Sequence, residues 1–159
     1  MPAEALAEAG IVPAKGRSAF RPEADGLWLM AGNNKKSDFM KYNEHYSYII
    51  GCRLSNFLWK IVKRWDYLDQ DTLGKQLIKS ADAISSNIAE GWHRYYKKDK
   101  LLFYNYARSS FYEVIDHINK GITRGLISRH EAQVIKELLI QFPKPMNGLI
   151  KGAKDNLKK

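Results

Sequence analysis

One stretch of the sequence, from His93 to Arg108, is rich in both basic and aromatic residues. From Lys100 to Tyr112, a cation and a tyrosine alternate at intervals of four residues, which places them along one line of a helix. Positive side chains contact phosphates, and an aromatic face can stack on any base, so the pattern is typical of surfaces for single-stranded nucleic acid. Alternatively, a run of charged residues can form a surface that contacts only solvent. The candidate nucleic-acid-binding residues are Arg94, Lys97, Lys98, Lys100, Tyr104 and Arg108.

Residue patterns that indicate an enzyme are sparse. Four histidines occur without the His-Glu-x-x-His pair of zinc enzymes, and no Gly-x-x-x-x-Gly-Lys loop is present to hold the phosphates of ATP. Asp116 and His117 are adjacent, so on a helix they point in different directions, which argues against a triad with Ser109. We therefore expect no catalytic residue, no metal ion and no cofactor.

Charge divides the chain into two parts. The 159 residues carry a net charge of +9, yet residues 1–39 hold five basic and five acidic side chains, so the whole excess falls on residues 40–159. The first part lacks helical periodicity and contains three of the five prolines. We expect residues 1–39 to form a flexible extension, with a start codon assigned too far upstream of Met40 as an alternative explanation. A short helix with a docked Trp28 is the other alternative.

The second part, residues 40–159, shows helical periodicity almost throughout. Apolar residues recur at intervals of three and four over residues 50–65, 73–92, 103–122 and 135–149. Asp69 or Asp71 is the expected N-cap of the second helix, and Ser128 with Glu131 has the capping-box spacing at the start of the fourth. A break is expected between Gln141 and Pro145. Four helices with short connections predict an all-α, antiparallel up-down-up-down bundle.

Composition also indicates the cellular compartment in which the protein is expected. The single cysteine, Cys52, cannot form an intramolecular disulfide, and no apolar run is long enough to span a membrane. A cytoplasmic protein without a membrane partner is therefore expected.

The second predicted helix contains the string ADAISSNIAEG, residues 81–91. This resembles the motif of the four-helix proteins encoded by intervening sequences of bacterial 23S ribosomal RNA. Further matching strings follow in the family's order: Lys97-Lys98-Asp99, Ala107-Arg108-Ser109-Ser110 with Glu113, and Gly125-Leu126-Ile127-Ser128. Ser85 stands where the family usually has proline. The resemblance covers about residues 42–154.

The resemblance implies a ring of subunits, commonly a homopentamer, with no established catalytic residues. Accessory proteins of diversity-generating retroelements look similar, and they work as basic partners of a reverse transcriptase and its RNA. We therefore expect a non-enzymatic, basic oligomer that binds RNA or single-stranded DNA. The alternatives are a scaffold for a reverse transcriptase and a small helical ribonuclease. The ribonuclease hypothesis rests on Arg124 and His130, whose spacing resembles that of HEPN domains. Gly125 replaces the polar residue that usually follows the arginine in those domains.

Overall fold

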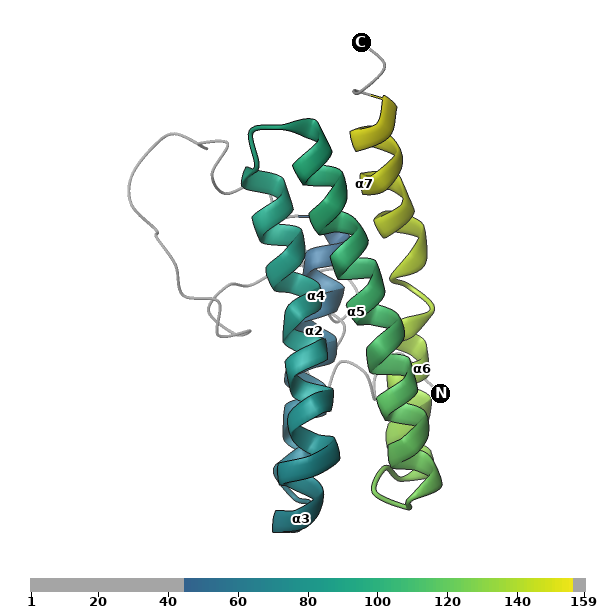
Figure 1. The fold of residues 1–159 in the computed structure, drawn as a ribbon. Helices are drawn as coiled ribbons and strands as arrows, with labels where there is room; N and C mark the ends of the chain where they lie inside the picture. The colour runs from purple at the N-terminus through teal and green to yellow at the C-terminus, as the bar shows by residue number, and fades with distance from the viewer. Residues whose placement is uncertain (1–44, 156–159) are drawn as a thin grey trace, which may run out of the picture. The chain divides into compact units, whose positions relative to one another are not determined.

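The computed structural model describes residues 45–155, which are helical and contain no strand (Figure 1). This confirms the all-α prediction for this part of the chain, whereas the predicted extension over residues 1–39 lies outside the described residues. The described α-helices are α2 (Tyr46–Val62), α3 (Tyr67–Asp69), α4 (Lys75–His93), α5 (Lys97–Thr123), α6 (Arg129–Leu139) and α7 (Pro143–Asp155).

The predicted apolar stripes form most of the interior, but the last residue of the third stripe, Ile122, is 43% exposed. Leu58 of α2 and both Ile84 and Ile88 of α4 have no exposed surface, because stripes at a spacing of three and four face the neighbouring helix. α4 packs against both α2 and α5, and α7 packs against α5 (Figure 1). The candidate residues on α5 therefore sit on a helix whose inner face is covered from two sides.

The connection between α2 and α4 differs from the prediction. Asp66, not Asp69 or Asp71, caps the new helix, and its carboxylate accepts a 2.9 Å hydrogen bond from the Asp69 amide. A π-helical turn over Gln70–Gly74 then continues α3 directly into α4. The prediction of the N-cap was wrong because the helix begins within a few residues of the end of α2, so the later aspartates lie inside it.

The connection between α5 and α6 follows the sequence pattern closely. Gly125 adopts a φ of 74°, a conformation that glycine tolerates better than other residues. Ser128 and Glu131 form the predicted capping box at the start of α6. Burial on its own raises the pKa of Glu131, but hydrogen bonds from Arg64 and Ser128 lower it overall. The Arg64–Glu131 ion pair thus joins the end of α2 to the start of α6.

The expected break near the prolines separates α6 from α7. α6 ends at Leu139 and α7 begins at Pro143, where a proline is tolerated because its missing amide would be unpaired in the first turn. Phe142, in the break, is 1% exposed and stacks on Phe111 with 4.4 Å between ring centroids. Among residues 45–155, no helix has both the length and the apolar composition of a membrane span.

Candidate nucleic-acid interface

Two tyrosines project from the turn between α4 and α5. α4 ends at His93 and α5 begins at Lys97, with Arg94 and Tyr96 in extended conformation between them. Tyr95 is 89% exposed and Tyr96 67%, and their rings meet edge to face with 5.2 Å between centroids. Neither tyrosine is among the candidate residues from the sequence, although both stand between its cations. Their position in a helix-to-helix turn is the signal that could have identified them.

Arg94 is held by two interactions. It forms an ion pair with Glu90, one turn earlier in α4, and its guanidinium carbon lies 4.4 Å from the centroid of the Phe103 ring. Such stacking of a cation on an aromatic face is attractive. Arg94 therefore fixes the start of α5 against the end of α4, and only part of its surface is open to solvent.

The candidate lysines differ in their surroundings. Lys97 and Lys98 are exposed in the first turn of α5, and Arg108 is exposed three turns further along the same helix. Lys100 is half-buried, and its ammonium donates a 2.8 Å hydrogen bond to the main-chain carbonyl of Trp92. Lys97, Lys98 and Arg108 are thus the exposed residues among the candidate cations.

Tyr104 lies inside the fold and not on the outer face of α5. It is 4% exposed and packs against Gly91 of α4, and burial raises the pKa of its phenol to about 12. A line of residues four apart rotates by roughly 40° around a helix at each step, because one turn takes 3.6 residues. The line from Lys100 to Tyr112 therefore crosses the covered face of α5 at Tyr104 and returns to solvent at Arg108.

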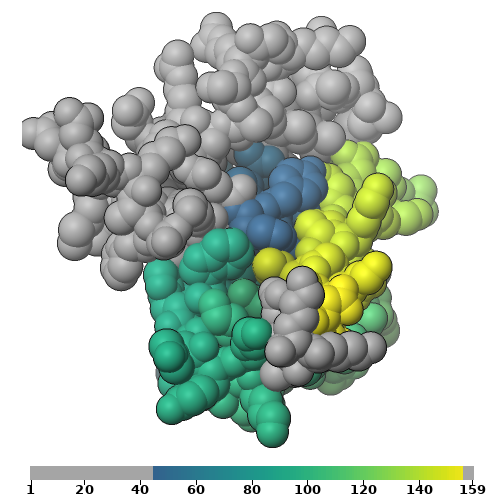
Figure 2. Space-filling view, turned by 90° about the horizontal axis from the view of Figure 1, so that it is seen from above, coloured from purple at the N-terminus to yellow at the C-terminus, as the bar shows by residue number. Residues whose placement is uncertain are grey.

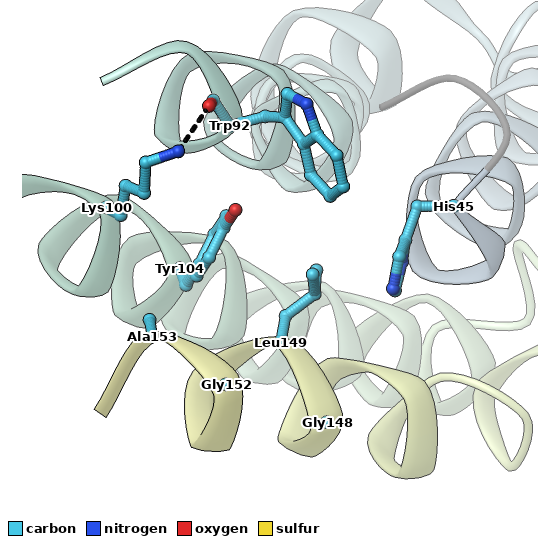
Figure 3. A pocket seen from close by; sticks show the side chains of 8 residues that line it. All are labelled: His45, Trp92, Lys100, Tyr104, Gly148, Leu149, Gly152 and Ala153. Carbon is cyan, nitrogen blue, oxygen red and sulfur yellow. Dashed lines mark hydrogen bonds between the residues drawn. The ribbon is translucent and has the colours of Figure 1, made fainter. Parts of the chain in front are cut away.

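A pocket of about 340 Å³ opens beside Tyr104 (Figure 3). In this close-up the side chains of His45, Trp92 and Leu149 point toward the same space as the ring of Tyr104. In the view from above, the start of α2, the α4–α5 turn and the end of α7 adjoin one another (Figure 2). The residues that line the pocket are His45, Trp92, Lys100, Tyr104, Gly148, Leu149, Gly152 and Ala153.

His45 forms one wall of the pocket as a neutral imidazole. Its Nδ1 atom accepts a 3.3 Å hydrogen bond from the Ser47 amide as the N-cap of α2, which places the ring proton on Nε2. Burial lowers the pKa of His45, so the neutral form is favoured. The His45 and Trp92 rings are tilted by 48°, with 6.2 Å between their centroids.

The alternative catalytic residues lie elsewhere. Arg124 is the C-cap of α5 and His130 is in the first turn of α6, and both are exposed. His117 of α5 has its Nδ1 atom 3.3 Å from the hydroxyl of Ser80 on α4. Within residues 45–155, no three side chains of the His, Cys, Asp or Glu types are grouped closely enough to hold a metal ion.

Comparison with known proteins gives the family of the chain. The family model described as 23S rRNA-intervening sequence protein matches residues 47–148, which include all the helices from α2 to α6 except the first residue of α2. None of the curated proteins compared matches the chain. The matched region contains the motif over residues 81–91 and every candidate residue from Arg94 to Arg108. The chain therefore belongs to the 23S rRNA-intervening sequence protein family.

Proposed function

We propose that the protein is non-enzymatic and binds RNA or single-stranded DNA through the turn between α4 and α5 and the outer face of α5. The observation that carries the proposal is the pair of exposed rings, Tyr95 and Tyr96, directly before the exposed Lys97 and Lys98. Bases stack on aromatic faces irrespective of their identity, while lysines contact the phosphates between them. Arg108 extends the cationic surface along α5.

The exposure of these rings favours a ligand over a purely structural role. Burying aromatic surface stabilises a fold, so rings that serve packing are covered, as Tyr104 is. Tyr95 and Tyr96 instead remain exposed in the turn before α5. Their polar hydroxyl ends alone do not explain two adjacent open rings beside two lysines.

We further propose that the helices form an antiparallel up-down-up-down bundle and that copies of it assemble into a ring, with a homopentamer as the expected form. The course of α2, α4 and α5 in Figure 1 and the family of the chain support this arrangement. Trp59, Leu102 and Tyr106 are each about half exposed and offer apolar area for contacts between subunits. A ring would repeat the α4–α5 surface around an axis and so concentrate its charge.

A salt titration tests the binding proposal. Fluorescence anisotropy of a labelled RNA or DNA single strand should show binding that weakens linearly on a plot of log affinity against log salt concentration, because counterions are released from the phosphates. A duplex of the same length serves as the comparison and should bind more weakly, since its bases are not free to stack. The absence of salt-sensitive binding to either single strand would overturn the proposal.

A scaffold for a reverse transcriptase is the second candidate function, favoured by the exposed apolar side chains Leu102 and Tyr106 on α5. Under this alternative the basic side chains serve solubility. Purification of the protein from its native cells separates the two functions. A reverse transcriptase recovered without nucleic acid favours the scaffold, whereas nucleic acid recovered without a protein partner favours direct binding.

The ribonuclease alternative needs Arg124 and His130 to act together. They lie on either side of the α5–α6 connection, and both are exposed to solvent. If RNA is degraded by the purified protein, the double variant Arg124→Ala/His130→Ala should abolish degradation. Degradation that persists in this variant would eliminate the pair as the site.

A further inference from the structure

We propose that the pocket between α4, α5 and α7 receives a single unstacked nucleobase of the bound strand. This inference rests on the proposed function, since it specifies how the same end of the molecule holds its nucleic acid. It goes beyond the exposed Tyr95 and Tyr96, which lie outside the residues that line the pocket. The pocket would fix one base while the surface beside it holds the backbone.

The walls of the pocket suit a flat aromatic ligand. Trp92, Tyr104 and His45 contribute three rings, and Leu149 adds an apolar side chain (Figure 3). Flat bases gain affinity from contact with such rings whichever base is present. The Tyr104 hydroxyl and the Nε2–H of His45 supply polar groups that the edge of a base requires.

The opposite wall is open because α7 carries glycine at two positions one turn apart. A Cβ atom added at Gly148 or at Gly152 would meet no atom within 4 Å. The volume of about 340 Å³ lies at the lower end of the range for small-molecule pockets, roughly 300–1,000 Å³. The volume is thus suited to one small group, such as a single base.

The charge beside the pocket selects a ligand that carries phosphate. Lys100 lines the pocket, and Lys97 lies one turn earlier on the same side of α5. A purely apolar ligand would gain nothing from these ammonium groups. Lys100 donates one hydrogen bond to the carbonyl of Trp92, and an ammonium has two further N–H groups that can contact an anion. A planar ring joined to an anionic backbone satisfies both the aromatic walls and the cations.

The test fills the pocket from the α7 side. In Gly152→Leu the new Cβ would meet no atom within 4 Å, so we expect the fold to be retained, and Gly148→Leu is a second variant at the same wall. Asn147→Leu is the matched control, because Asn147 is exposed on α7 and does not line the pocket. The probes are a labelled uridine homopolymer and an abasic strand of equal length, which keeps the phosphates but has no bases. Circular dichroism and native mass spectrometry check fold and assembly.

If the pocket holds a base, filling it should reduce the affinity only for a strand that has bases. Gly152→Leu should weaken binding of the homopolymer by roughly tenfold and leave binding of the abasic strand unchanged, while Asn147→Leu should bind both strands as the wild type does. Wild-type affinity of Gly152→Leu and Gly148→Leu for the homopolymer would overturn the pocket proposal and leave the proposed function standing. A wild-type protein that binds neither strand would overturn both.

A change in the number of subunits would indicate that the pocket holds something other than a base. If both leucine variants alter the subunit number without altering strand affinity, the pocket receives a segment of another subunit, and the nucleobase proposal is overturned. If Gly152→Leu loses helical structure, Gly148→Leu and the smaller change Gly152→Ala decide the question with the same two probes.

Discussion

The ammonium of Lys100 donates a 2.8 Å hydrogen bond to the main-chain carbonyl of Trp92, across the turn that joins α4 to α5. Carbonyls in the last turn of a helix have no partner within that helix, and a cation near them is favourable for the helix dipole. A lysine that sequence analysis assigns to phosphate binding therefore stabilises the turn that carries Tyr95 and Tyr96. Lys100 thus combines a positive charge with a structural hydrogen bond, whereas its neighbour Lys98 is exposed.

We expect Lys100→Met to lower the free energy of unfolding by about 1–2 kcal/mol, because the Trp92 carbonyl loses its charged donor. Lys98→Met should change it by less than about 0.5 kcal/mol, since Lys98 is exposed. Urea denaturation followed by circular dichroism measures both. Equal effects of the two substitutions would show that the hydrogen bond does not support the turn.

We expect Lys98→Gln and Arg108→Gln each to weaken single-strand binding and to reduce the slope of log affinity against log salt by about one unit, since each removes one phosphate contact. The two positions lie far apart on α5, so the double variant should show the sum of the single effects. Lys75→Gln is the control, because Lys75 pairs with Asp71 at the start of α4. A loss as large in Lys75→Gln would mean that only the total charge matters.

We expect Gly91→Ala to destabilise the fold by about 1–3 kcal/mol, because the added Cβ would lie 2.8 Å from Cε1 and 2.9 Å from Cδ1 of Tyr104. Gly148→Ala is the matched variant in α7, where the Cβ meets open space, and it should stabilise the helix by about 0.5–1 kcal/mol. Thermal unfolding monitored by circular dichroism compares them. Equal melting temperatures would show that α4 and α5 are not in close contact at Gly91.

We expect the free energy of unfolding to fall at alkaline pH because the phenol of Tyr104 is buried. Its pKa is about 12 in the folded protein against 10.0 for an ordinary tyrosine, so the folded state holds the phenol proton more tightly than the unfolded state. This contribution is complete below pH 10 and is lost as the pH rises toward 12. Between about pH 9 and pH 11 the wild type should lose about 1 kcal/mol more than Tyr104→Phe. Parallel denaturation curves for the two proteins across this interval would contradict the burial of the phenol.

Features that depend on neighbouring residues were predictable from the sequence. The three-and-four spacing placed Ile84 and Ile88 in the interior, where both have no exposed surface. Ser128 and Glu131 form their capping box because both partners lie within one helical turn. A proline at position 143 lacks the amide that a continuous helix would need, so the break before it follows from one residue.

Only the tertiary structure decided which residues beside the apolar stripes are covered. Tyr104 and Arg108 have the same spacing from their neighbours in the sequence, yet α4 packs over Tyr104 and leaves Arg108 exposed. The pocket combines His45, Trp92 and Gly152, which are distant in sequence and meet only after α2, α4 and α7 have packed together. The spacing of apolar residues shows which side of a helix faces the interior. The burial of a residue beside that stripe depends on the position of the other helices, which spacing within one helix does not encode.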